Sequence, residues 1–248
     1  SQNGSIMDTL TNHSDHISSL IVLHNGNLVS ASKDQTINIW NNKTVERVLT
    51  GLNSGITCLT LLPNTDFASG SKNGEINIWT STGDLKKTIQ AHSEDIQQLI
   101  TLQNGNLASG SCDNTIKVWD RDGNLKQTLV GHTKCVMSLA QLENGLLLSG
   151  SWDLTLKVWN IEEGKLLHIY SYDVAPNALG LLPNGDLIYQ GKTSDIQIRS
   201  VDQVSSGSLE SKMNITNNNL ILNFAVFSNG DIACGKWNVI GIWKRQQL

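Results

Sequence analysis

The sequence has few prolines, few aromatic residues and no excess of charge of one sign. Only 3 of its 248 residues are proline and 5% are aromatic, whereas 39% are hydrophobic, which is typical of a folded domain rather than a disordered chain. The formal net charge is −4, so no strongly basic surface is expected and we expect no nucleic acid partner. No apolar run approaches the roughly 18 residues of a membrane-spanning helix, and we expect no association with a membrane.

The four cysteines, Cys58, Cys112, Cys135 and Cys234, are scattered along the chain. None belongs to a CxxC pair or stands near a histidine at zinc-finger spacing, so we expect no metal site and no cofactor. Scattered thiols in a domain of this size are typical of reducing compartments. We therefore expect reduced cysteines and a cytoplasmic protein, with a nuclear location as the alternative.

What the sequence does have is a repeated phrase, with a period of about 40 residues. Its fullest copies are AHSEDIQQLITLQNGNLASGSCDNTIKVWD, from Ala91, and GHTKCVMSLAQLENGLLLSGSWDLTLKVWN, from Gly131. The six copies end at Trp40, Trp79, Trp119, Trp159, Arg199 and Trp243. Such regular spacing predicts an array of similar structural units.

Each copy of the phrase predicts four short strands. Two apolar runs are separated by an Asn-Gly pair, as at Asn25, Asn104 and Asn144, and this pair predicts a hairpin with a type I′ turn, in which both residues have positive φ. A third run, such as TIKVW, alternates polar with apolar residues, and a polar turn leads to a fourth, such as LKQTLV. Four strands in about 40 residues are typical of one blade of a β-propeller.

The repeated phrase resembles the WD40 repeat, which begins with Gly-His and ends with Trp-Asp. The copies that end in SGSCDNTIKVWD and SGSWDLTLKVWN match it closely, and the resemblance covers the whole chain. It implies an all-β fold: one domain, residues 1–248, forming a six-bladed WD40 β-propeller with four antiparallel strands per blade.

The two ends of the chain are expected to complete one blade. The segment NGSIMDTLTNH aligns with DGNLKQTLVGH of the third repeat, so residues 5–11 are expected to form an outer strand that has no blade of its own. The last repeat, from about residue 220 to Trp243, is followed by only five residues and lacks an outer strand. Pairing of these parts would close the propeller and remove open sheet edges. The alternative, a fragment of a seven-bladed propeller, is disfavoured by this match.

The resemblance also implies a hydrogen-bonded set of His, Ser, Asp and Trp in each regular repeat. The three complete sets are His13, Ser30, Asp34 and Trp40; His92, Ser109, Asp113 and Trp119; and His132, Ser149, Asp153 and Trp159. Repeat two has Leu52 and Asn73 in the His and Asp positions. Recurrence at repeat spacing indicates a structural role, because a hydrolase triad occurs once, and no GxSxG motif is present.

Candidate partner-binding residues follow from the positions that tend to point to the contact face of WD-repeat proteins. These positions directly precede the Asp of the set, or lie three and five residues after its His. They carry large apolar side chains in repeats four and six and lysines in three other repeats, which gives Met137, Trp152, Leu220, Leu222, Trp237, Lys33, Lys72 and Lys192. Trp and Met are favoured in interface cores. The alternative is that the indoles pack across a neighbouring blade and that the lysines are solvated.

We therefore expect a monomeric, non-catalytic scaffold or adaptor that binds protein or peptide partners on a face of the propeller. One alternative is a ubiquitin- or phosphopeptide-binding module of a larger regulatory protein, although no arginine cluster marks a phosphate site. A propeller enzyme, such as a glycosidase or a metal-dependent lactonase, is disfavoured because the predicted inner strands carry no carboxylate. No catalytic residue is proposed.

Overall fold

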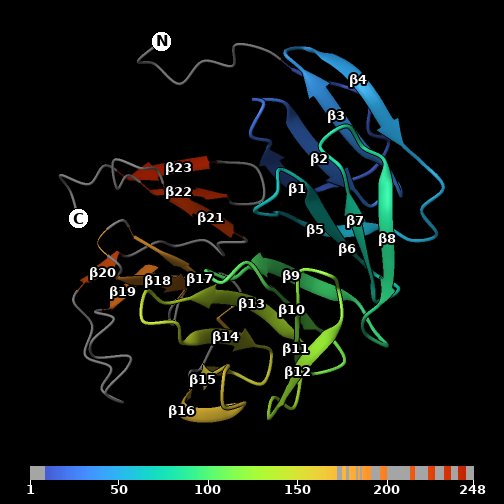
Figure 1. The fold of residues 1–248 in the computed structure, drawn as a ribbon. Helices are drawn as coiled ribbons and strands as arrows, with labels where there is room; N and C mark the ends of the chain where they lie inside the picture. Colours follow the sequence, from blue (N-terminus) through green and yellow to red (C-terminus); the bar gives the residue numbers. More distant parts are fainter. Residues whose placement is uncertain are drawn as a thin grey trace. The chain divides into compact units, whose positions relative to one another are not determined.

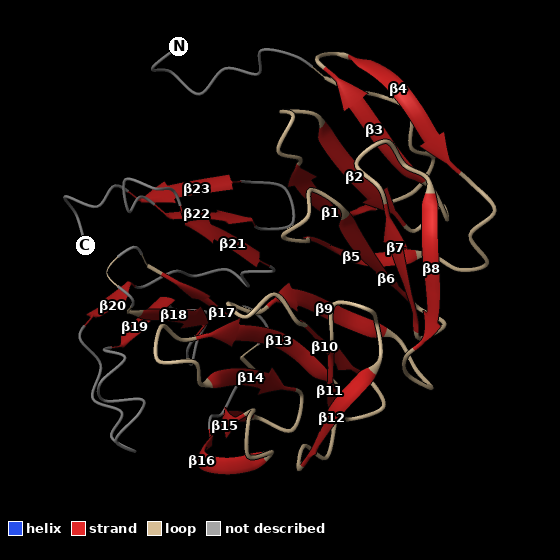
Figure 2. Cartoon of the chain, viewed as in Figure 1, coloured by secondary structure: helices blue, strands red, loops and turns tan. Residues whose placement is uncertain are grey.

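All regular structure in the described part of the chain is β-strand (Figure 2). The computed structural model describes residues 9–171, 175–176, 179–182, 184, 186–190, 196–199, 213–215, 223–226, 232–235 and 240–243. The chain divides into two compact units, Ser1–Ile96 and Gln97–Leu248. An all-β fold built of antiparallel sheets is therefore confirmed.

The first unit holds two four-stranded antiparallel sheets, in the orders β1-β2-β3-β4 and β5-β6-β7-β8 (Figure 1). Consecutive strands are neighbours throughout, so each sheet is a simple meander. The strands are β1 (Ile17–Val22), β2 (Leu28–Ser32), β3 (Ile37–Asn41), β4 (Thr44–Leu49), β5 (Ile56–Leu61), β6 (Phe67–Ser71), β7 (Glu75–Trp79) and β8 (Leu85–Gln90).

The second unit repeats this meander in the sheets β9–β12, β13–β16 and β17–β20, and its last sheet has three strands within the described residues, β21-β22-β23. Its first strand, β9, begins at the unit boundary. The strands are β9 (Ile96–Thr101), β10 (Leu107–Ser111), β11 (Thr115–Trp119), β12 (Leu125–Val130), β13 (Val136–Gln141), β14 (Leu147–Ser151), β15 (Thr155–Asn160), β16 (Lys165–Ser171), β17 (Leu179–Leu181), β18 (Leu187–Gln190), β19 (Ile196–Arg199), β20 (Met213–Ile215), β21 (Asn223–Val226), β22 (Ile232–Gly235) and β23 (Ile240–Trp243).

The second strand of each regular sheet is buried on both faces. Every residue of β6, β10 and β14 is buried, whereas the outer strands β8 and β12 are largely exposed. The sequences of the buried strands, FASGS, LASGS and LLSGS, are rich in small residues. A Cβ at Gly70 would lie 2.7 Å from Cys58 Sγ and 2.9 Å from Ile96 Cγ2. Small residues therefore let the layers approach closely.

The hairpin turns differ from the predicted type I′ geometry. Gly26, Gly105 and Gly145 have φ near +85°, at 87°, 81° and 86°, but the asparagines before them do not have positive φ. Gly26 N donates to Leu23 O, and Leu23 N donates to Asn27 O, the pattern of a type I turn followed by a glycine bulge. Asn25 instead accepts from Asn27 N through its side chain, so its role is an Asx turn. The type I′ prediction was wrong, although the hairpins are present.

The predicted closing strand falls largely outside the described residues. Residues 5–8 are not described, and residues 9–11 do not belong to a strand. The number of blades and the closure therefore stay predictions.

Candidate partner-binding site

Trp152 lies in the tight turn between β14 and β15, and the backbone of this turn is fixed. Trp152 N donates to Cys135 O at 3.0 Å, and Leu154 N donates to Ser151 O at 3.1 Å. Asp153 N donates to Ser151 Oγ at 3.0 Å. Lys33 and Lys72 occupy the same repeat position, with the matching bonds from Lys33 N to His16 O (2.9 Å) and from Lys72 N to Gly55 O (3.0 Å). The repeat thus fixes the backbone, while the side chain at this position varies.

Beneath the turn, the four residues of the fourth repeat form one continuous hydrogen-bond chain. His132 Nδ1 lies 2.8 Å from Asp153 Oδ2, and His132 Nε2 lies 2.7 Å from Ser149 Oγ. Trp159 Nε1 donates to Ser149 Oγ at 2.7 Å. A proton on Nδ1 satisfies every group, because Ser149 can then donate to Nε2 and accept from the indole. Buried polar groups are therefore paired and hold Asp153 at the base of the turn.

The Asp153 carboxylate is the charged centre of this arrangement. Burial on its own would raise its pKa, but hydrogen bonds from Thr155, His132 and Thr133 N outweigh burial and lower the pKa to about 2. Burial also lowers the pKa of His132, against the opposing effect of Asp153. The buried ammonium of Lys157 lies 3.8 Å from Asp153 Oδ2. The carboxylate is therefore ionised, and its oxygens are engaged by hydrogen bonds and charges within the same repeat.

The first repeat contains the same arrangement. His13 Nδ1 lies 3.0 Å from Asp34 Oδ2, His13 Nε2 lies 2.7 Å from Ser30 Oγ, and Trp40 Nε1 donates to Ser30 Oγ at 2.8 Å. Burial would raise the pKa of Asp34, but hydrogen bonds from Thr36, Ser14 N and His13 lower it to about 2. The structure thus brings together all four predicted residues in repeats one and four.

In the other repeats the structure shows parts of the set. Trp119 Nε1 donates to Ser109 Oγ at 2.9 Å, and Asp113 accepts from Thr115 Oγ1 at 2.6 Å; His92 is buried in the first unit. In repeat two, Trp79 Nε1 donates to Ser69 Oγ at 2.9 Å. There Leu52 packs against the hydrophobic core of the first unit, so apolar packing replaces the imidazole.

The side chains at the predicted partner-binding positions differ in exposure. The indole of Trp152 is 49% exposed and Leu154, two residues later, is 41% exposed. Met137 is half-buried, and Lys33 and Lys72 are exposed. Leu220, Leu222, Trp237 and Lys192 lie outside the described residues. In the part of the site that is described, an exposed apolar pair therefore stands at the β14–β15 turn.

Leu154 is a candidate contact residue that the sequence analysis missed. Its φ is +66°, a conformation that costs a non-glycine residue free energy. The corresponding residues in repeats one to three are Gln35, Gly74 and Asn114, all with positive φ. A branched apolar residue is the least suited of these to the conformation, and half-exposure gives it little compensation from packing. The signal in the sequence that could have indicated this role was the position of Leu154 two residues after Trp152.

The expectation of four reduced cysteines was wrong for two of them. Cys112 and Cys135 form a disulfide, while Cys58 is buried and belongs to no disulfide; the side chain of Cys234 is not described. Cys112 directly precedes the Asp of repeat three, and Cys135 lies three residues after the His of repeat four. In the first unit, the corresponding residues are Lys33 and Gly55, where a Cβ on Gly55 would lie 3.2 Å from Lys33 Cα. The repeat geometry thus places these positions in contact, although they are 23 residues apart in sequence.

No group of three or more His, Cys, Asp or Glu side chains that could hold a metal ion occurs among the described residues. Within the same residues, no helix is long and apolar enough to cross a membrane.

Comparison with protein families identifies the repeats. The model of the WD domain, G-beta repeat, matches residues 4–41, 43–80, 83–120 and 123–160, which is more than half of the chain. The chain therefore belongs to the WD40 repeat family. No individually curated protein sequence matches it significantly.

Among solved structures, one chain of the "Crystal Structure of Mitotic Checkpoint Complex" is similar to this chain. The TM-score is 0.84 with 22% sequence identity, over 94% of this chain and 76% of that chain. At this identity the likeness shows the fold alone.

Proposed function

We propose that the protein is a non-catalytic interaction scaffold that binds a protein or peptide partner at the β14–β15 turn. The observation that carries the proposal is the exposed indole of Trp152, held by a fixed backbone and followed by exposed Leu154. Tryptophan is the residue most enriched among binding hot spots, and a rigid turn reduces the conformational entropy lost on binding. The WD40 family, and a structural neighbour that belongs to a protein complex, support this class of function.

The same proposal includes the closed six-bladed arrangement, with residues 5–11 as the outer strand of the last blade. It is supported by six consecutive sheets that follow the repeats and by the three strands described in the last sheet. Deletion of residues 1–11 is expected to lower the urea midpoint of unfolding, because it would expose a sheet edge. An unchanged midpoint would contradict the closure.

The binding proposal is tested with Trp152→Ala and a matched control, Leu125→Ala. Leu125 is 50% exposed, against 49% for Trp152, and lies on the outer strand β12. Proteins captured from cell extract by wild type and by the control, but not by Trp152→Ala, are purified and titrated by calorimetry. Trp152→Ala is expected to weaken binding by about 2 kcal/mol or more, roughly 30-fold, with little change in stability. Equal affinities for the purified partner in all three proteins would refute the site.

A further inference from the structure

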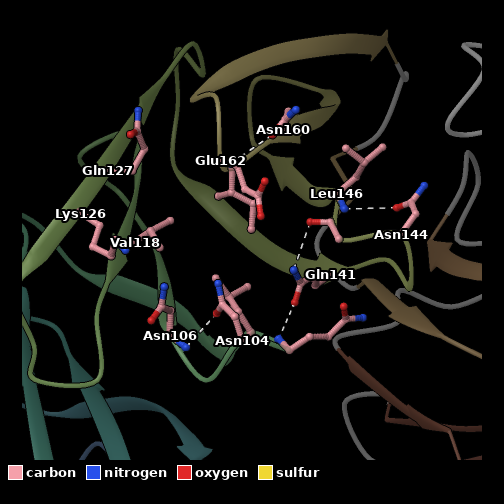
Figure 3. Close-up of a pocket in the computed structure, with 14 residues that line it drawn as sticks. Asn104, Asn106, Val118, Lys126, Gln127, Gln141, Asn144, Leu146, Asn160 and Glu162 are labelled. Atoms are coloured by element: carbon pink, nitrogen blue, oxygen red, sulfur yellow. Dashed lines mark hydrogen bonds between the residues drawn. The ribbon is translucent and has the colours of Figure 1, made fainter.

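The second unit contains a polar cleft at the opposite end of the same strands from Trp152. Its volume is about 540 Å³. Lys126 and Val118 come from one side of it and Leu146 and Asn144 from the other (Figure 3). β14 runs from Leu147 to Ser151, so the cleft residue Leu146 and the turn residue Trp152 bracket this strand and lie roughly 20 Å apart. The cleft is therefore separate from the proposed partner-binding turn.

Amide side chains dominate the wall of the cleft. Of its fourteen lining residues, seven are Asn or Gln: Gln103, Asn104, Asn106, Gln127, Gln141, Asn144 and Asn160. Each amide has donor and acceptor groups, which are the groups of a peptide main chain. No aromatic side chain is among the lining residues, so a sugar ring would find no stacking surface. The lining thus complements an extended peptide better than a saccharide.

Two of these amides hold the wall itself. Gln103 N donates to Gln141 Oε1 at 2.8 Å, and Gln141 Nε2 donates to Gly145 O at 3.1 Å. Gln103 Nε2 donates to Leu142 O at 3.1 Å. The two bonds from Gln103 join the β9–β10 turn to the end of β13 and the turn after it, and the third bond lies within that hairpin. The cleft therefore has a fixed wall and is not a gap between loosely packed turns.

A counterpart in the first unit shows how the same place in the repeat can be filled from within. It has a volume of about 290 Å³ and is lined by Asn25, Asn27, Ile39, Glu46, Arg47, Ser81 and Thr82. Asn27 Nδ2 donates to Glu46 Oε2 at 2.7 Å, and Arg47 forms an ion pair with Asp84 at 2.9 Å. In the second sheet, Lys86 pairs with Asp66 at 2.7 Å. These three pairs of polar side chains thus satisfy one another within the first unit.

In the cleft of the second unit, the two side chains at the corresponding repeat positions do not pair with each other among the described residues. By strand register, Asn106 occupies the position of Asn27 in the first sheet and of Asp66 in the second. Lys126 occupies the position of Glu46 in the first sheet and of Lys86 in the second. Among the described residues, no hydrogen bond or ion pair joins Asn106 to Lys126. Lys126 and Glu162 are both exposed where they line the cleft. The charge of Lys126 contributes to lowering the pKa of Asp120, but no hydrogen bond or ion pair joins these two side chains among the described residues. The Lys126 ammonium, the Glu162 carboxylate and the Asn106 amide are therefore available to a ligand.

We propose that this cleft binds an extended peptide segment of a protein partner, with an acidic side chain against Lys126. The amides of Asn106 and Gln127 receive its main chain, and Glu162 favours a basic residue beside the acidic one and disfavours a second acid. This is a second binding site, and it does not depend on the proposed role of Trp152.

A displayed library of random eight-residue peptides, selected on the wild-type chain, provides the probe. The enriched peptides are synthesised with blocked ends and titrated against four variants. Asn106→Asp places a carboxylate beside Lys126, as Asp66 lies beside Lys86, and Lys126→Glu reverses the charge. Asn53→Asp adds the same charge at an exposed residue outside the cleft lining, and Trp152→Ala alters only the other site.

The selected peptides are expected to share an acidic residue and to bind Asn106→Asp and Lys126→Glu at least tenfold more weakly than wild type. Asn53→Asp and Trp152→Ala are expected to bind as wild type does, so failure of either site is distinguished from failure of the other. The proposal is overturned if no peptide is enriched, if the enriched peptides lack an acidic residue, or if folded Lys126→Glu binds them with unchanged affinity.

Discussion

Ser149→Ala and Ser69→Ala test whether the buried hydrogen-bond chain stabilises a repeat. Both serine side chains are buried, and each accepts from a tryptophan indole, Trp159 or Trp79. Ser149 Oγ is also 2.7 Å from His132 Nε2, whereas repeat two has Leu52 in the histidine position. The same substitution thus leaves two buried groups unpaired in repeat four and one in repeat two.

The magnitude follows from the number of groups left unpaired. Each buried donor or acceptor without a partner costs roughly 1–3 kcal/mol, so we expect about 3 kcal/mol for Ser149→Ala and about 1.5 kcal/mol for Ser69→Ala. Exposed Ser93 provides a control, since Ser93→Ala is expected to change stability by less than about 0.5 kcal/mol.

The assay combines urea unfolding with hydrogen exchange. Because the chain has two compact units, a single transition is not assumed, and exchange of the β6 and β14 amides reports each repeat separately. The free energy of local opening should fall about twice as much at β14 in Ser149→Ala as at β6 in Ser69→Ala. Equal losses in the two variants would refute the view that the histidine contributes through Ser149.

Two further predictions follow from the same residues. The pKa values of Asp34 and Asp153 are lowered from 3.8 to about 2. Each carboxylate therefore contributes about 2 kcal/mol to the free energy of unfolding above pH 4, and this contribution is lost as the pH falls towards 2. Measuring the free energy of unfolding against pH should show the loss, and Asp153→Asn should remove half of it. Gly74→Ala should lower the free energy of unfolding by about 3 kcal/mol, and Gly26→Ala by about 1 kcal/mol. A Cβ at Gly74 would lie 2.7 Å from the His92 carbonyl carbon, whereas nothing lies within 4 Å of a Cβ at Gly26. Equal urea midpoints for these two variants would contradict the clash.

The sequence predicted the parts of the fold that repeat. The period of the phrase, the alternation in runs such as TIKVW and the Asn-Gly pairs located the strands, because each of these signals is local and recurs. The turn type was wrong since Asn-Gly serves two hairpin geometries, and the choice depends on loop length: five residues separate β1 from β2, too many for a two-residue turn.

Contacts between repeats were beyond this reasoning. Cys112 and Cys135 are 23 residues apart, and only the stacking of one sheet on the next brings their side chains together. The cleft was missed for the same reason, because its walls come from turns and strands of two repeats. Trp152 could be proposed as a contact residue because its turn position is a local property, whereas the conformation of Leu154 becomes visible only in the backbone angles.

The disulfide and the exposed tryptophan belong to one physical arrangement. Cys135 is covalently tied to Cys112, and the carbonyl of Cys135 accepts the hydrogen bond from Trp152 N. In the first unit, the equivalent carbonyls of His16 and Gly55 hold the backbone of Lys33 and Lys72 without a covalent bond among the described residues. Among the described residues, Trp152 is the one residue at this repeat position with a large exposed apolar side chain. It is also the one whose backbone is held by a disulfide-bonded residue, Cys135. Restricting the motion of the residue that holds Trp152 lowers the entropy that a partner must remove on binding, which is the property expected of a contact residue and not of a loosely solvated indole.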